Sequence, residues 1–291
     1  MNISEVSFDS GGQRCAATLY RPASAAGPLA CVVMGHGVTL TRRDGIPDYA
    51  TRLAESGFAV LAFDYRHFGD SEGQPRHWVS IRRQLEDWRA AVAFARQLDG
   101  VEPSRVALWG MSLGGAHALT TAANDASVAA VIALAPLTDG LAFMLMPTPP
   151  ATIARIMLRA TREAISRRPC PMPIAGAPGE FAALDAPEAL SGFERLTAGG
   201  DWSNQFNPSQ LFLTGFYRPV RRAASITMPA LLQLAEHDAV VPLPAIEKTA
   251  ARAPKAELLR YPTDHFGCFW PEHLDQVAAD QLRFLERHLG S

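Results

Sequence analysis

The strongest constraint on the fold is an alternation of short, continuous apolar runs with segments whose apolar residues recur at helical spacing. Continuous apolar runs are typical of strands that are buried on both faces of a sheet. Such runs occur at LACVVMGH (29–36), FAVLAFDY (58–65), RVALWG (105–110), VAAVIALAP (128–136), PALLQLAEHD (229–238) and AELLRYP (256–262). Helices are expected at 47–57, 80–98, 113–123, 244–252 and 274–289. This alternation predicts a parallel sheet with helices on both faces.

The N-terminal segment precedes the alternating part and contains two strand-like runs with no helical segment between them. ISEVSF (3–8) and CAATLY (15–20) are typical of two strands, and the connection DSGGQR between them contains two glycines. A short glycine-containing connection between two such runs predicts a β-hairpin.

The alternation stops between residue 137 and about residue 225, where the chain is rich in Pro, Met and Arg. A stretch of this length is far too long for an ordinary connection inside a compact domain. We therefore expect a largely helical cap or lid at 140–225, inserted after the sixth strand, and a core formed by 1–139 and 226–291. Six apolar residues form either an adaptable roof over a pocket or the cap's own core: Phe143, Met144, Met146, Ile153, Ile156 and Met157.

Composition and charge exclude several classes of protein. The 291 residues are 48 % hydrophobic, and the net charge of −2 gives no reason to expect nucleic acid or an anionic membrane as a partner. We expect no membrane span and no signal peptide, and the four scattered cysteines fit free thiols in a cytoplasmic protein. No Cys/His cluster indicates a metal. Whether the chain forms a homo-oligomer cannot be read from its sequence.

Three arginines of the expected cap, Arg155, Arg159 and Arg162, fall on one helical face. A solvated face is the ordinary interpretation of such a pattern. A site for a carboxylate or phosphate group of a substrate is the alternative, because a guanidinium pairs well with planar anions.

The stretch LWGMSLGGAHAL (108–119) contains the strongest chemical motif. Gly110, Ser112 and Gly114 fit the pattern G-x-S-x-G between a predicted buried strand and a predicted helix. A sharp turn there strains the serine backbone and leaves no room for bulky neighbours, which explains the glycines. The N-terminus of the helix also directs free N–H groups at developing negative charge. Ser112 is therefore predicted to be a nucleophile.

A serine hydroxyl is a weak nucleophile at neutral pH, so a base and an orienting acid are needed. His265 follows the last predicted strand, at the edge where catalytic loops of open α/β sheets lie, and it comes after the serine in the chain. Asp238 follows the preceding strand and is the preferred acid. Asp139 follows the strand after the serine and is the alternative. The expected oxyanion donors are the backbone N–H groups of Leu113 and Val38.

These motifs resemble the α/β-hydrolase superfamily, and within it the bacterial serine esterases that have an HGx oxyanion loop and an inserted cap. The matching motifs are GHGV, AFDYRHFGDSEG, GMSLGG, AEHDAVVP and DHFGCF. The resemblance implies an α/β-hydrolase fold with a mostly parallel, eight-stranded sheet. It also implies a catalytic triad of Ser112, Asp238 and His265.

The residues and the resemblance together predict a serine hydrolase that cleaves a carboxylic ester or thioester of a small molecule. The reaction runs through an acyl-enzyme on Ser112 and needs no metal or organic cofactor. Phe143 and Met144 are expected in the substrate pocket. An acyltransferase that uses the same triad is an alternative, and a non-catalytic binding protein on the same scaffold is another, because a fold alone does not name a function.

Overall fold

The sheet is built from the continuous apolar runs, because strands inside a parallel sheet are covered on both faces. In the computed structural model, which describes residues 1–24, 27–166, 168–200 and 202–290, the strands are β1 (Asn2–Ser10), β2 (Gln13–Arg21), β3 (Leu29–Gly35), β4 (Ala59–Phe63), β5 (Val101–Met111), β6 (Ala130–Leu134), β7 (Ala230–Ala235) and β8 (Ala256–Tyr261). Their order in the sheet is β1-β2-β4-β3-β5-β6-β7-β8. β1 pairs antiparallel with β2, and β2 with β4; the other pairings are parallel. The predicted mostly parallel, eight-stranded sheet is confirmed.

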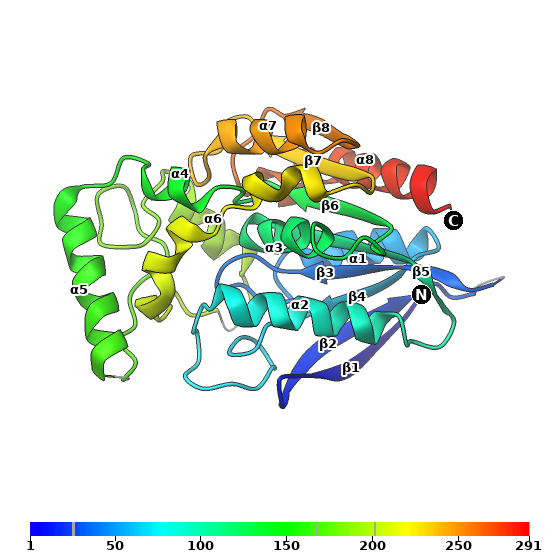
Figure 1. Cartoon of the computed structure of the whole chain (residues 1–291), viewed down its shortest axis with the longest axis horizontal. Coiled ribbons are helices and arrows are strands. Elements are labelled where there is room, and N and C mark those ends of the chain that lie inside the picture. Colours follow the sequence, from blue (N-terminus) through cyan, green and yellow to red (C-terminus); the bar gives the residue numbers. More distant parts are fainter. Residues whose placement is uncertain (25–26, 167, 201, 291) are drawn as a thin grey trace.

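In the described part of the chain, five helices cover this sheet: α1 (Ile46–Glu55), α2 (Ile81–Ala95), α3 (Ser112–Ala122), α7 (Leu243–Arg252) and α8 (Pro271–Leu289). In Figure 1, α2 and α3 lie in front of the sheet, and α1 and α8 lie behind it. The helices α1, α2, α7 and α8 each bury an apolar face, as α2 does with Trp88, Ala91 and Val92, whereas α3 is buried on nearly every side. Within the described residues, no helix is both long and apolar enough to cross a membrane.

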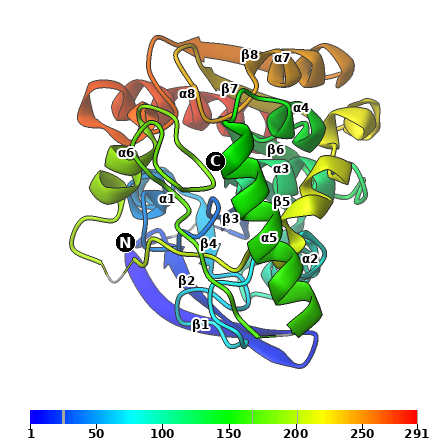
Figure 2. The same ribbon diagram turned by 90° about the vertical axis from the view of Figure 1, so that its left-hand side faces the viewer.

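Residues 140–225, called the insertion below, leave the sheet after β6 and return before β7. They contain the α-helices α4 (Gly140–Met144), α5 (Pro150–Ser166) and α6 (Ala189–Leu196), and the 3₁₀-helices η1 (Pro208–Phe216) and η2 (Pro219–Ser225). The 3₁₀-helices were not expected from the sequence; both begin with a proline, whose fixed φ suits a first helical turn. In Figure 2, α5 lies in front of one end of the sheet.

The two ends of the insertion are joined to each other where they meet the core. The backbone N–H of Gly140 donates to the carbonyl of Tyr217 (2.9 Å), and that of Val220 donates to the carbonyl of Thr138 (2.9 Å). A Cβ on Gly140 would collide with the backbone carbonyl of Thr214. The base of the insertion is therefore held by main-chain contacts that require a glycine.

Candidate active site

Ser112 lies in a sharp turn between β5 and α3. Its φ of 52° is in the left-handed region, which is costly for a residue with a side chain. The flanking glycines leave the space that this turn needs: a Cβ on Gly110 would collide with the backbone of Gly114, and a Cβ on Gly114 with the carbonyls of Gly35 and His36. The turn thus packs backbone against backbone and fixes the place of the serine.

His265 and Asp238 are hydrogen-bonded in the loops that follow β8 and β7. The Nδ1 atom of His265 lies 2.6 Å from Oδ2 of Asp238, and both side chains are buried. The other carboxylate oxygen of Asp238 accepts from the backbone N–H groups of Val240 (2.8 Å) and Val241 (3.0 Å). Both carboxylate oxygens of Asp238 therefore accept hydrogen bonds, and these bonds fix its orientation toward the imidazole.

The environment of this pair raises the pKa of the imidazole. Burial alone would lower the pKa of His265, but the charge and hydrogen bond of Asp238 outweigh it, so the pKa is raised above its ordinary value of 6.5. The carboxylates of Glu188 and Asp264 add to this rise. Glu188 precedes α6 in the insertion, and it accepts a hydrogen bond from the backbone N–H of Ala239, beside the acid (2.8 Å).

Ser112 and His265 are not joined directly. Among the described residues, no hydrogen bond links the Ser112 hydroxyl to His265. Catalytic hydrogen bonds are often long in a protein without substrate and tighten when substrate binds. Ser112 lines a cavity whose wall also includes Val240 and Val241, the residues that hold the acid.

The two expected oxyanion donors lie at the same cavity. Leu113 is the second residue of α3, so its N–H has no partner within the helix. In the described part of the chain, the Val38 N–H donates to no backbone carbonyl or side chain. Val38 and Leu113 both line the cavity. These contacts leave both N–H groups available to a ligand.

Buried His36 supports the loop that carries Val38. Its Nδ1 atom donates to the carbonyl of Gly37 (2.8 Å), and its Nε2 atom accepts from the N–H of Tyr65 (3.4 Å). Burial lowers its pKa to about 4, against the opposing charge of Asp64. A neutral imidazole with one donor and one acceptor matches both contacts.

Asp139, the alternative acid, binds other partners. Its side chain accepts from the backbone N–H groups of Leu141 (3.1 Å) and Ala142 (3.3 Å), where it caps the N-terminus of α4. It also forms a two-point ion pair with Arg218, with both distances at 2.7 Å. Its oxygens thus hold the two ends of the insertion together, whereas those of Asp238 face the imidazole.

The cavity has a volume of about 570 Å³, within the usual range for small-molecule sites. Most of its wall is apolar. The sequence allowed two interpretations of six apolar residues, a roof over the pocket or a core of the cap. All six line this cavity: Phe143, Met144, Met146, Ile153, Ile156 and Met157. Among the described residues that line the cavity, Asp185 is the only one with an ionisable side chain. These contacts favour the roof over a self-contained cap core.

The arginines of α5 lie away from this cavity. Arg155 and Arg159 stack over the ring of Phe181, at 4.0 and 5.4 Å from its centroid, and Arg159 donates to the carbonyl of Pro171 (2.9 Å). None of the three arginines lines the cavity among its described residues, so the solvated face is the better interpretation. The described residues also contain no group of three or more His, Cys, Asp or Glu side chains that could hold a metal ion.

Sequence reasoning missed several residues near the site. Glu188 and Asp185 lie in an irregular part of the insertion. Tertiary folding brings this part close to the loop after β7, which contains Asp238 and Ala239. Tyr217 was missed as well: its hydroxyl contacts His117 (2.8 Å) and Thr120 (2.9 Å) of α3. No local sequence pattern signals such contacts, because each joins segments far apart in the chain.

Comparison with known proteins identifies the family. The sequence model described as serine aminopeptidase, S33, matches residues 26–186. The quorum-quenching protein AidA of Acinetobacter baumannii is 39 % identical over 97 % of this chain and 94 % of its own length. A polyketide transferase of Stachybotrys chlorohalonatus is 28 % identical over 92 % of this chain and 91 % of its own length.

A solved structure agrees with this result. The α/β hydrolase GrgF of Penicillium sp. superposes with a TM-score of 0.86, at 26 % identity and with 100 % of both chains covered. The family model spans more than half of this chain. The chain belongs to the serine aminopeptidase S33 family of the α/β-hydrolase superfamily.

Proposed function

We propose that this chain is a serine hydrolase that cleaves a carboxylic ester or thioester through an acyl-enzyme on Ser112. The observation that carries the proposal is the buried 2.6 Å hydrogen bond between His265 and Asp238, beside a cavity that a strained serine lines. An imidazole held by a buried carboxylate can accept a proton and is stabilised when it becomes charged. The family supports a hydrolytic reaction.

The residues divide the reaction among them. His265 takes the proton of Ser112 as the hydroxyl attacks the substrate carbonyl, and the N–H groups of Val38 and Leu113 bind the oxyanion. His265 then gives this proton to the leaving alcohol or thiol, which leaves an ester on Ser112. Water enters, loses a proton to His265 and releases the acid, while Asp238 keeps the imidazole in the required tautomer.

The test is activity on p-nitrophenyl esters and on thioesters of graded acyl length. We expect turnover by the parent, and a loss on the order of 10⁴ or more in Ser112→Ala, because the covalent route is removed. Near-normal turnover by Ser112→Ala would contradict the proposal. A folded parent that turns over no ester and does not react with a fluorophosphonate probe would favour a non-catalytic binding protein.

Acyl transfer is the second candidate. A relative that is 28 % identical over 92 % of this chain is named a polyketide transferase, and transfer uses the same acyl-enzyme. The two reactions differ in whether water or another nucleophile releases the acyl group. Product analysis with added alcohols and amines separates them: release of free acid alone supports hydrolysis, and a dominant new ester or amide supports transfer.

The relative named as a quorum-quenching protein suggests a biological context, and we extend that context to this chain. We expect the purified protein to silence a quorum-dependent bacterial reporter, and Ser112→Ala to leave the reporter active. Equal silencing by both would separate any effect from the proposed chemistry. The apolar wall of the cavity suits a small apolar acyl substrate better than nucleic acid.

We further propose that residues 140–225 act as the cap and that the protein works in the cytoplasm. The described residues of the insertion form five helical segments, and many of them line the cavity with Ser112. All four cysteines lie in described ranges and are free, which suits a reducing compartment. Cell fractionation tests the location, and recovery of the protein outside the cytoplasmic fraction would contradict it.

A further inference from the structure

The cavity extends along the edge of the sheet where the parallel strands end, and its two ends differ. Since the strand order is β4-β3-β5-β6-β7-β8, Val79 and Ile81, which lie between β4 and β5 in the chain, mark one end. Val240 and Val241, after β7, mark the other. Ser112, after β5, lies between them. A bound ester must therefore place its acyl group toward one end and its leaving group toward the other.

The position of His265 decides between the two orientations. This inference rests on the proposed function, in which His265 gives its proton to the leaving oxygen or sulfur. His265 follows β8 and is hydrogen-bonded to Asp238 after β7, so it approaches the serine from that side. The leaving group must lie within hydrogen-bond reach of the imidazole. The acyl group is then directed away from it, toward Val79 and Ile81.

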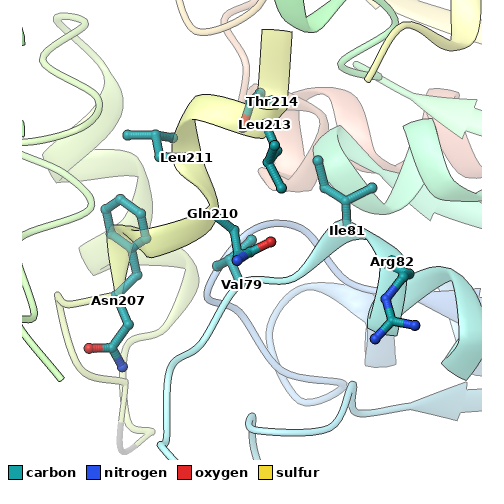
Figure 3. A pocket seen from close by; sticks show the side chains of 9 residues that line it. Val79, Ile81, Arg82, Asn207, Gln210, Leu211, Leu213 and Thr214 are labelled. Atoms are coloured by element: carbon teal, nitrogen blue, oxygen red, sulfur yellow. The ribbon is translucent and has the colours of Figure 1, made fainter. Parts of the chain in front are cut away.

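A side pocket of about 80 Å³ adjoins the end of the cavity at Val79 and Ile81. The residues that line this side pocket are Val79, Ile81, Arg82, Phe206, Asn207, Gln210, Leu211, Leu213 and Thr214. Five of them also line the main cavity, so the two spaces adjoin. In Figure 3, Gln210 and Leu213 of η1 lie opposite Val79, which precedes α2, and Ile81, the first residue of α2. The side pocket lies at the seam between insertion and core.

The opposite end of the cavity carries a charge. Asp185 lines the cavity together with Ala186 and Pro187. Glu188, the next residue, accepts a hydrogen bond from the backbone N–H of Ala239, which lines the cavity beside Val240, so we assign Asp185 to the Val240 end. Among the described residues, the carboxylate of Asp185 has no hydrogen bond and no ion pair with a protein group. A half-buried carboxylate next to the leaving-group position favours a positive charge or a hydrogen-bond donor there.

We propose that the substrate binds in one orientation: a straight acyl chain runs past Val79 and Ile81 into the side pocket, and the leaving group lies against Asp185. The apolar walls at Val79, Ile81 and Leu211 stabilise the chain by burying its methylene groups. The substrate class is therefore an ester or thioester of a straight-chain acid with a leaving group that is cationic or donates hydrogen bonds.

The first part of the test examines the acyl group with a variant that blocks the side pocket. Leu213 lines the side pocket and not the main cavity, and it is 43 % exposed, so Leu213→Trp fills the side pocket without disturbing the core. On p-nitrophenyl acetate to decanoate, this variant should lose on the order of tenfold in kcat/KM for decanoate relative to acetate. Leu158→Trp, on exposed α5 and outside both spaces, is the matched control and should keep the parent profile.

The second part of the test examines the leaving group by changing the charge at the Asp185 end of the cavity. Butyrylcholine and 3,3-dimethylbutyl butyrate share an acyl group and differ by one positive charge in leaving groups of the same shape. The parent should prefer the choline ester, and Asp185→Asn should reduce that preference about fivefold. Asp48→Asn, at an exposed position of α1, is the matched control. The chain-length ratio should respond to Leu213→Trp and the charge ratio to Asp185→Asn.

The outcomes separate orientation from activity. If Leu213→Trp changes the charge ratio and Asp185→Asn changes the chain-length ratio, the substrate binds in reverse, and the inference is overturned. It is also overturned if neither ratio changes. If the parent hydrolyses no ester, the proposed function fails, and calorimetric binding of decanoate decides: weaker binding to Leu213→Trp than to Leu158→Trp supports the side pocket, and equal binding overturns it.

Discussion

At the scale of single residues, the two candidate acids differ in what their carboxylates bind. Asp238 gives one oxygen to His265 and the other to backbone N–H groups, so its charge acts on the imidazole. Asp139 is paired with Arg218 and caps α4, so its charge acts on the base of the insertion. The same residue type after two strand ends thus has two different roles.

Two amide substitutions test this difference. Asp238→Asn should lower kcat on the order of 10³–10⁴ at neutral pH, because an amide stabilises the wrong tautomer of His265. Asp139→Asn should lower the melting temperature, since it removes the charge that Arg218 faces, and should cost far less in kcat. Calorimetry and steady-state kinetics on both variants give the comparison. A larger kcat loss in Asp139→Asn would reverse the assignment.

The pH profile reports the environment of His265. The imidazole must be neutral to accept a proton, so kcat/KM falls as pH drops through the pKa of His265 in the free enzyme. Asp238 raises this pKa above 6.5 against the effect of burial, so the acid limb should have its midpoint above pH 6.5. In Asp238→Asn burial dominates, and the midpoint of the residual activity should move to lower pH. A parent midpoint below 6.5, or no movement in the variant, would contradict this account.

At the scale of elements, the turn between β5 and α3 is built by backbone contacts. A Cβ on Gly110 would collide with the backbone of Gly114, and a Cβ on Gly114 with the carbonyls of Gly35 and His36, while Ser112 between them has a positive φ. The strain at the serine persists because β5 and α3 are both anchored in the core. The elements on either side therefore fix the geometry of the serine.

Gly110→Ala tests this dependence. The added methyl must displace the backbone of Gly114, and overpacking of this kind costs about 1–3 kcal/mol. We expect chemical denaturation to show a loss of that size, together with reduced kcat. Gly27→Ala is the matched control, because its Cβ would meet no atom within 4 Å. Equal stability of the two variants would mean that the turn is not closely packed.

How much the sequence predicts depends on whether the signal is local. Apolar runs and helical spacing predicted the strands and the core helices, because burial on both faces or on one face leaves a local pattern. The same logic brought Asp238 and His265 to neighbouring strand ends, and their catalytic roles stay predictions. The 3₁₀-helices and the position of Asp185 were not predicted, because the segments that contain them take their shape from contacts with distant parts of the chain.

At the scale of the whole molecule, the insertion and the core form the cavity together. Core residues such as Val38 and Ser112 line one side, and Phe143 and Met144 of α4 line another. The insertion is joined to the core near Asp139 and through Tyr217, whose hydroxyl reaches α3. Substrate selection is therefore a property of both parts.

Truncation of the roof should change selectivity and leave the chemistry in place. Phe143→Ala and Met144→Ala each remove apolar wall, and a lost apolar contact is worth on the order of tenfold in kcat/KM. We expect the optimum of the p-nitrophenyl ester series to shift in acyl length. Leu145→Ala, at a position that is 75 % exposed and does not line the cavity, should keep the parent optimum. Unchanged optima in all three variants would show that the roof does not contact substrate.

The central claim is that the reaction passes through an acyl group on Ser112. The most direct measurement is intact-mass spectrometry of the protein quenched during turnover of a p-nitrophenyl ester, followed by peptide mapping. The account predicts one added acyl mass on the peptide that contains Ser112, and none on the Ser112→Ala protein. An acyl adduct on another residue, or ester turnover without any adduct on rapidly quenched protein, would contradict it.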